Sequence, residues 1–390
     1  MKKLIVILSL LSSSLFAQKP EKIYSIVKDP KSQEFYNTQA KLWGEEVKKR
    51  PKNASAWMNY YLASRYDNQM YLKGQPEDKS KLMQSIVDGM KKNVPNSIEY
   101  YECALQTDKG EETKDTTQRV GWLKKGYAIA PNNPGILEEY VNHCEINNQP
   151  SKLKELYTHL YSSKTYDIGF IEFDYNMLMS LDKNAILFTS GDGDTYPTRI
   201  LQEVKGVRED VTVINAYLAC TYPDMLKRLL KEKNITMPDE LLKKGINTTN
   251  PMAFIKELSL EINKKYPDAP LFYGITCDLE NFYTDSLYCT GLAWKYSPKP
   301  IDNISKLKNN IENHFHLDYL DDNYYENNSV SEEVTENLHV AYVTPFAILY
   351  RHYKSMGESN DRTEFYKNFI MTCADKMGKK EEMEKYLDSK

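Results

Sequence analysis

The sequence lacks the features that mark several large classes of protein. Lys and Arg number 51 against 55 Asp and Glu, so there is no basic excess to neutralise nucleic-acid phosphates. Beyond Ala17 we find no apolar stretch of the roughly 20 residues that a bilayer crossing needs. Charged residues at 27% and hydrophobic residues at 41% are ordinary globular proportions. We therefore expect two or three folded domains that bind no nucleic acid.

Cysteine is scarce, with six scattered residues and no Cys-x-x-Cys pair. A structural zinc site needs closely spaced Cys and His ligands, so none is expected. Most of the thiols should be buried, although Cys277 and Cys289 would pair in an oxidising compartment if the strands that carry them were neighbours. The chain also lacks a Gly-x-Ser-x-Gly elbow and any clear Ser/His/Asp or Cys/His order. No nucleophilic catalytic site is predicted.

The first 17 residues have the pattern of a secretory signal. Lys2 and Lys3 precede an apolar run over residues 4–10, and Ala17 ends a small-residue cleavage site. No Cys stands near this site, so a lipoprotein anchor is not indicated. We expect cleavage after Ala17 and a soluble periplasmic or otherwise exported product, with an uncleaved anchor as the alternative.

Three segments of the first half open alike, with Pro and Asn before a run rich in aromatic residues. They begin at Pro51, Pro95 and Pro131, a spacing of about 40 residues that is typical of paired-helix repeats. Proline fixes φ for a first helical turn, and Asn or Ser caps its free amides. The pattern resembles degenerate tetratricopeptide repeats over about residues 30–178. Their second helices are expected at 79–92, 117–130 and 151–162.

The aromatic side chains of these helices have two competing roles. Rings at helical spacing mostly pack between helices, and the remainder line a groove. Tetratricopeptide arrays bind peptides or partner proteins on a concave face, so the resemblance implies a protein or peptide partner in the cell envelope. The candidates for contact with this partner are Trp57, Tyr60, Tyr61, Tyr100, Tyr101 and Tyr140.

The pattern changes to strands alternating with helices near residue 184. Short apolar runs, typical of strands buried on both faces, lie at 185–189, 211–215 and 270–276. Helices are expected between and around them at 197–204, 223–233 and 253–265. This alternation predicts a parallel sheet with helical crossovers, a small Rossmann-like α/β domain.

The predicted fold class is thus α + α/β. A tetratricopeptide-like helical-repeat array is expected over residues 18–180 and the Rossmann-like domain over 181–302. A polar loop and C-terminal helices, where the helical pattern returns, are expected over 303–390.

Polar residues follow each of the predicted strands. A Gly-x-Gly-x-x-Gly phosphate loop is absent, and the acidic turn after the first strand would repel a pyrophosphate, so NAD and FAD are not expected. Ligands of open parallel sheets bind beyond the carboxyl ends of the strands. The candidates there are Asp192, Asp194, Asn215 and Asp278, with Arg199 one turn into the following helix.

The turn at Asp192-Gly193-Asp194 has two interpretations. Carboxylates two positions apart on a glycine-rich turn can share a divalent cation. The same side chains can instead bond turn amides and cap the next helix. Arg199 also has two interpretations. It either binds an aspartate or an anionic ligand, or it lies in a surface salt bridge. No cofactor is predicted apart from this alternative cation.

The stretch from Asn184 to Asn215, with the core Gly-Asp-Gly-Asp-Thr-Tyr-Pro, resembles a known family. It is similar to the soluble C-terminal part of a bacterial multi-spanning membrane family of unknown function, related to transmembrane protein O-mannosyltransferases. The resemblance covers about residues 182–320. It implies homology of this domain and a Gram-negative envelope setting. It does not imply catalysis, because glycosyl transfer in such enzymes belongs to the multi-spanning portion, of which this sequence shows no sign.

The favoured function is a non-enzymatic envelope protein that binds proteins or peptides through its helical arm. The alternative is a glycan-pathway enzyme, or a module that binds a sugar or nucleotide sugar, using Asp192 and Asp194 with a divalent cation. The two hypotheses make different predictions for the turn at residues 192–194. Only the second requires both carboxylates to converge on an open pocket.

Overall fold

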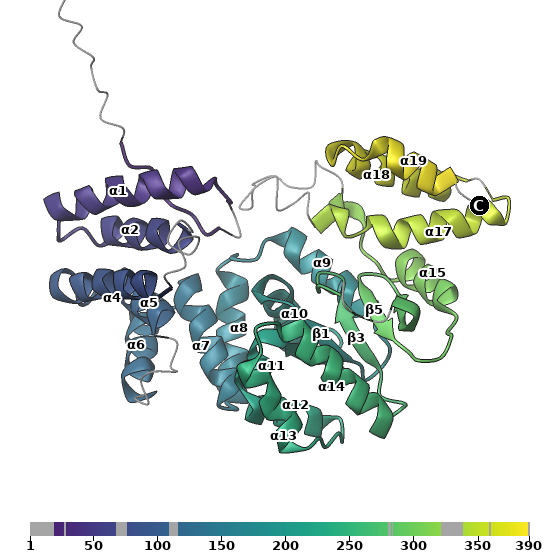
Figure 1. Cartoon of the computed structure of the whole chain (residues 1–390), viewed down its shortest axis with the longest axis horizontal. Coiled ribbons are helices and arrows are strands. Elements are labelled where there is room, and N and C mark those ends of the chain that lie inside the picture. The colour runs from purple at the N-terminus through teal and green to yellow at the C-terminus, as the bar shows by residue number, and fades with distance from the viewer. Residues whose placement is uncertain are drawn as a thin grey trace, which may run out of the picture. The chain divides into compact units, whose positions relative to one another are not determined.

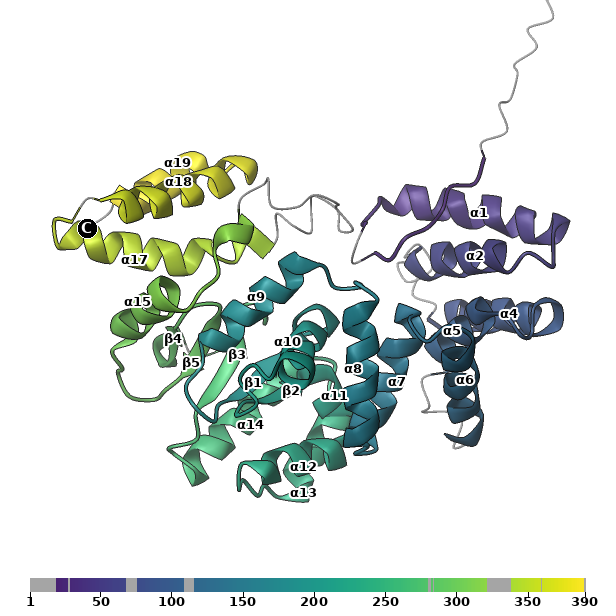
Figure 2. The ribbon, with the colours of Figure 1, turned by 180° about the vertical axis from the view of Figure 1, so that it is seen from behind.

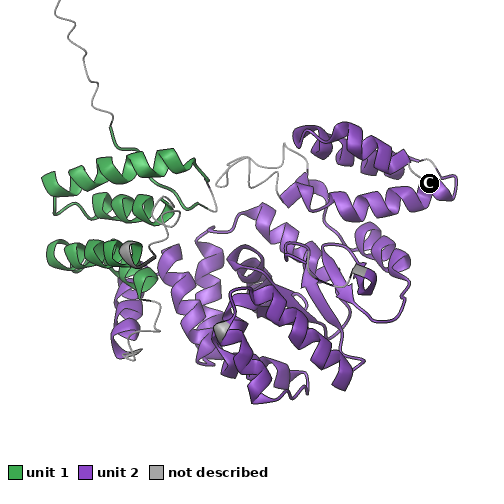
Figure 3. Cartoon of the chain, viewed as in Figure 1, with its two compact units in different colours: residues 1–26, 30–114 green, residues 27–29, 115–390 purple. Residues whose placement is uncertain are grey.

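The computed structural model describes residues 19–26, 29–67, 76–108, 116–279, 282, 284–320, 338–358 and 360–388. The predicted signal segment lies outside these residues. Contacts divide the chain into two compact units, residues 1–26 with 30–114 and residues 27–29 with 115–390 (Figures 1 and 3). In the described ranges, no helix combines the length and apolar character that a membrane crossing requires.

The first unit consists of helices that begin at capped turns. Side-chain oxygens of Ser32, Asn53 and Ser97 accept from the backbone N–H three residues later, at 3.1 to 3.2 Å. The predicted capping of helices after the Pro-Asn and Pro-Asn-Ser turns is confirmed at Asn53 and Ser97. Neighbouring helices in the chain pack on one another. They are α1 (Gln33–Lys49), α2 (Ala54–Tyr66), α4 (Pro76–Asn93) and α5 (Ile98–Thr107).

The second unit opens with four more helices. Asn133 caps one of them by accepting from the amide of Ile136 at 2.9 Å, as the third Pro-Asn turn predicted. The three expected second helices of the first half are all present to within three residues. The helices of this segment are α6 (Thr116–Ile129), α7 (Pro134–Ile146), α8 (Pro150–Ser162) and α9 (Ile168–Met179).

A five-stranded sheet follows, in the order β2-β1-β3-β5-β4. The three predicted strands are present and parallel, but the last two strands are antiparallel, so the sheet is mixed rather than wholly parallel. Only Thr290, Gly291 and Leu292 join β4 to β5, a link too short for the crossover that a parallel pair requires. The strands are β1 (Ile186–Thr189), β2 (Thr212–Asn215), β3 (Leu271–Gly274), β4 (Leu287–Cys289) and β5 (Ala293–Tyr296).

Strand β1 is buried on both faces, as its continuous apolar run predicted. Ile186 and Phe188 pack in one core with α11, α12 and α14, whereas Leu187 packs in a second core with α9 and the C-terminal helices. Successive side chains of a strand point to opposite faces, which explains the division. The helices of this region are α10 (Asp192–Lys205), α11 (Ala216–Thr221), α12 (Pro223–Glu232), α13 (Asp239–Lys243) and α14 (Pro251–Lys265).

Helix α10 begins five residues before the predicted start at Pro197. The proline therefore lies inside the helix and not in its first turn. The earlier start arises because Asp194, at the third helical position, reaches back to the amides of Ser190 and Gly191.

The C-terminal helices close the second core, with α17 lying between α15 and the pair α18 and α19 (Figure 2). Most of the predicted polar loop lies outside the described residues. All six cysteines are buried and free, so Cys277 and Cys289 form no disulfide. The remaining helices are α15 (Asn303–Asn313), α17 (Val343–Ser355), α18 (Asp361–Lys376) and α19 (Lys380–Asp388), with 3₁₀ turns at Lys244–Asn247, Thr284–Ser286 and Asp318–Leu320.

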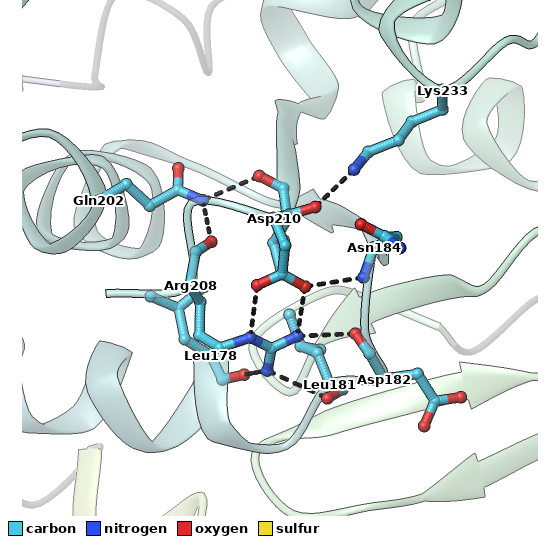
Figure 4. A network of polar contacts seen from close by, with 9 residues as sticks. Leu178, Leu181, Asp182, Asn184, Gln202, Arg208, Asp210 and Lys233 are labelled. Atoms are coloured by element: carbon cyan, nitrogen blue, oxygen red, sulfur yellow. Dashed lines mark hydrogen bonds and ion pairs between the residues drawn. The ribbon is translucent and has the colours of Figure 1, made fainter. Parts of the chain in front are cut away.

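The turn between α10 and β2 carries Arg208, whose five N–H groups all have acceptors (Figure 4). Its guanidinium donates to the carbonyl oxygens of Leu178, Leu181 and Asp182 at 2.7 to 3.1 Å. The same group donates to both carboxylate oxygens of Asp210, at 2.8 and 3.0 Å. The carbonyls at the end of a helix have no partner within the helix, and Arg208 supplies one for those at and just beyond the end of α9.

Neighbouring polar groups extend this network to both strand entries (Figure 4). Asp210 accepts from the amide of Asn184, just before β1, at 2.7 Å. Gln202 donates to the carbonyls of Arg208 and Val211 at 2.9 and 2.8 Å, and Lys233 donates to the carbonyl of Asp210. The ends of α9, α10 and α12 are thus tied to the starts of β1 and β2.

Replacing Arg208 by Met should lower the free energy of unfolding by at least about 3 kcal/mol, because it leaves a carboxylate and three carbonyls without their donor. Arg208→Lys should recover only part of this loss, since an ammonium lacks the planar fork. Urea unfolding of the variants measures both effects. The exposed neighbour offers a control, and Glu209→Gln should stay within about 0.5 kcal/mol of the parent. If Arg208→Met lowered the free energy of unfolding no more than Glu209→Gln does, the proposed role of Arg208 would be contradicted.

The ion pair also predicts a pH dependence. Hydrogen bonds from Arg208 are the main cause that lowers the pKa of Asp210 to about 2. An unfolded Asp has a pKa near 3.9, so the stabilisation is full above about pH 5 and is lost as the pH falls through 2. The stability difference between the parent and Asp210→Asn should therefore shrink between pH 5 and pH 2. A difference that stays constant across this range in urea unfolding would contradict the assignment.

Candidate functional site

The predicted ligand residues lie where the parallel strands end. Thr189 of β1 and Asn215 of β2 are partners in register at this edge, and β3 ends beside them at Gly274. A Cβ added to Gly274 would lie 3.8 Å from a carboxylate oxygen of Asp194. The fold therefore brings Asp194 and Asn215 to one edge of the sheet, as the topology predicted.

Asp194 is buried and accepts three hydrogen bonds. Its carboxylate receives the backbone N–H groups of Ser190 and Gly191, each at 2.8 Å, and the hydroxyl of Thr276 at 2.7 Å. Burial raises the pKa of Asp194, while these hydrogen bonds act in the opposite direction. The carboxylate therefore fixes the strand-to-helix turn and ties it to the segment after β3.

Asn215 is also engaged within the protein. Its side-chain oxygen caps α11 by accepting from the amides of Tyr217 and Leu218, at 2.9 and 3.1 Å. Its amide nitrogen donates to the hydroxyl of Thr195 at 3.1 Å, and that hydroxyl lies 2.7 Å from the hydroxyl of Thr189. Asn215 thus joins β1, β2 and α10 through a buried polar network.

A second buried carboxyl, Asp174 of α9, lies behind this turn. Thr198 Oγ1 is 2.6 Å from Asp174 Oδ1 and 2.7 Å from the carbonyl oxygen of Asp194. The Thr198 hydroxyl is the donor toward both oxygens, whereas the second carboxylate oxygen of Asp174, Oδ2, is buried and has no hydrogen-bond partner among the described residues. Burial is also the main cause that raises the pKa of Asp174 well above its ordinary range. The one sequence signal for this residue is a lone Asp among the apolar residues of α9.

The other three candidates are placed differently from Asp194 and Asn215. Asp192 and Asp278 are exposed, unlike the buried Asp194. Arg199 forms salt bridges with Glu145 at 3.1 Å and Glu203 at 2.9 Å and meets no aspartate. The structure therefore separates the two carboxylates of the turn into one exposed and one buried group.

This arrangement favours structural hydrogen bonding over cation binding at the turn. A divalent cation takes several oxygen ligands with free lone pairs, whereas Asp194 already accepts from three donors. Over the part of the chain that the structure describes, no three His, Cys, Asp or Glu side chains are grouped to hold a metal ion.

The six predicted partner residues differ in exposure. Four of the rings are at least 93% buried in helix packing and present no surface to a partner: Tyr61, Tyr100, Tyr101 and Tyr140. Trp57 is half-buried, and its indole packs so closely on Gly89 of α4 that an added Cβ there would lie 2.6 Å from the ring. Tyr60, also half-buried, lines a cavity in the first unit.

This cavity of about 360 Å³ lies against α1 and α2. Its lining is mixed, with Lys41 and Lys48 from α1 and the ring of Tyr60 from α2. Lys48 is paired with Glu45 at 2.7 Å. Ser64 also lines the cavity, and its buried hydroxyl has no hydrogen-bond partner among the described residues. The cavity therefore combines an aromatic wall with charged side chains.

Asp194→Asn should lower the free energy of unfolding by about 2 kcal/mol or more. The amide oxygen of Asn can accept from one of the two turn N–H groups. The amide nitrogen is itself a donor, so the other N–H group loses its acceptor. Asp192→Asn is the matched control, because this group is exposed and its substitution should cost less than about 1 kcal/mol. Urea unfolding at pH 7 measures both. A more stable Asp194→Asn variant would show instead that the two carboxylates repel each other across an empty cation site.

Residues 171–264 match the family model of TMEM260-associated domain 2. This segment runs from α9 to α14, contains Asp174, Asp194 and the Arg208–Asp210 pair, and makes up less than half of the chain. No curated protein and no solved structure matches the chain. The match supports similarity of this segment to the C-terminal part of a TMEM260-like family.

Proposed function

We propose that the chain is a non-catalytic interaction protein of the cell envelope that binds peptide segments of a partner protein. Its helical hairpins would act as a degenerate tetratricopeptide-like array, and the sheet domain, Rossmann-like in its parallel part, would serve as a folded support. Export is part of this proposal and depends on the signal-like pattern of residues 1–17.

The observation that carries the proposal is the cavity lined by Tyr60 and Ser64. A half-buried aromatic ring offers contact area at low conformational cost, and such rings are frequent binding hot spots. Ser64 also lines the cavity, but its hydroxyl is buried, so the ring of Tyr60 is the group offered to a bound peptide. Lysines and carboxylates around the opening suit a polar peptide better than an apolar one.

The strand-end residues give less support to the alternative glycan-pathway enzyme. That hypothesis uses Asp192 and Asp194 together with a divalent cation. The carboxylate of Asp194 is buried and accepts three hydrogen bonds, whereas Asp192 is exposed. A binding role for the helical hairpins needs no such pair.

Selection of random 12-residue peptides on the mature chain, residues 18–390, tests the proposal. Peptides should be enriched, and their affinity for Tyr60→Ala should fall at least tenfold, since truncating a hot-spot ring costs about 2 kcal/mol. Ser64→Ala should change the affinity less than twofold, because this hydroxyl is buried. Fluorescence anisotropy with labelled peptides measures these affinities.

Tyr217→Ala is the matched control, because this tyrosine is 56% exposed and lies in the other unit. Its affinity for the same peptides should stay within twofold of the parent. If no peptide is enriched, or if Tyr60→Ala and Tyr217→Ala behave alike, the proposed site is wrong.

A further inference from the structure

A second cavity, of about 530 Å³, lies between the C-terminal helices of the second unit. Its size is within the range of small-molecule sites. Ile348, Arg351, His352 and Ser355 line it from one face of α17, since they follow the i, i+3, i+4, i+7 spacing of a helix. Ile304 of α15 and Leu387 of α19 supply the remaining apolar wall, and the ion-paired side chains of Lys354 and Asp388 complete the lining.

The basic groups of this pocket are not all neutralised. Lys354 donates to the carboxylate of Asp388 at 2.8 Å and to the carbonyl of Leu387 at 3.1 Å. Arg351 is half-buried and rests on the ring of Tyr386 at 4.9 Å, and none of the described residues accepts a hydrogen bond from its guanidinium. A guanidinium with five free donors at a partly dry site favours an oxyanion.

His352 lines the same face of α17. Its side chain makes no hydrogen bond with the described residues, and Asp302 at the start of α15 interacts with it electrostatically. The pKa of Asp302 is lowered mainly by hydrogen bonds from Ser305, with a smaller contribution from His352. Asp302 is exposed and already caps α15, so it does not fill the pocket.

We propose that this pocket binds a small amphiphilic anion, a carboxylate or phosphate on a single aliphatic chain. Arg351 holds the anionic head, with His352 as a second donor. Ile304, Ile348 and Leu387 cover the chain. An inorganic anion would leave the apolar wall unused, and an uncharged chain would leave the guanidinium without an acceptor.

Isothermal titration of the full mature chain with decanoate and decyl phosphate, below their micelle concentrations, tests this site. We expect saturable binding of at least one of them with a dissociation constant below about 1 mM. Acetate, inorganic phosphate and decanol should each bind at least tenfold more weakly, because each lacks either the chain or the charge. The stronger of the two amphiphiles identifies the head group as carboxylate or phosphate.

Two variants and a control separate the pocket from non-specific attraction. Arg351→Gln should weaken binding at least tenfold, and Ile348→Ser should weaken it several-fold. Lys385→Gln removes an equal charge from an exposed position of α19 outside the pocket lining, and should change the affinity less than twofold. Far-UV circular dichroism confirms that each variant is folded. Absence of binding by both amphiphiles, or equal weakening by Arg351→Gln and Lys385→Gln, would overturn the proposal.

Discussion

The guanidinium of Arg208 is the contact on which the central architecture depends. It supplies hydrogen bonds to carbonyls at and beyond the end of α9 and a two-point contact to Asp210, whose carboxylate in turn fixes the entry to β1. A helix end buried without such partners would be costly, because its last carbonyls find no donor within the helix. One side chain thereby positions α9 against the sheet and sets the starts of the two strands that lead to the candidate site.

At the opposite ends of those strands, polar residues hold the fold together instead of facing a ligand. Asp194 and Asn215 hold turn amides and a helix start, and Asp174 is buried behind them with its carboxyl group on the Thr198 hydroxyl. Buried polar groups require partners, and Asp194 and Asn215 are committed to their neighbours, while Asp174 keeps one oxygen without a partner among the described residues. The groups that attract a binding hypothesis lie elsewhere, at the cavity lined by Tyr60 and at Arg351 in the C-terminal helices.

Local signals predicted the individual elements well. Asn53, Ser97 and Asn133 mark helix starts because capping is decided by the residue itself and the three that follow. The buried strands were evident from continuous apolar runs. The β4–β5 hairpin was not predicted, because its short strands pair through a three-residue link with no strong turn signature. The early start of α10 was missed because Asp194 reaches back to amides that precede the helix.

The sequence by itself determined the helical hairpins, the three parallel strands and the meeting of Asp194 with Asn215 at one edge of the sheet, since these follow from periodicity, capping and topology. Tertiary structure alone decided how each functional group is used. Asp192 and Asp194 are two residues apart, yet one is exposed and the other buried. Likewise Tyr60 lines a cavity while Tyr61 is buried. Burial and hydrogen-bond partners come from segments distant in the chain, such as Thr276 for Asp194, and local sequence carries no record of them.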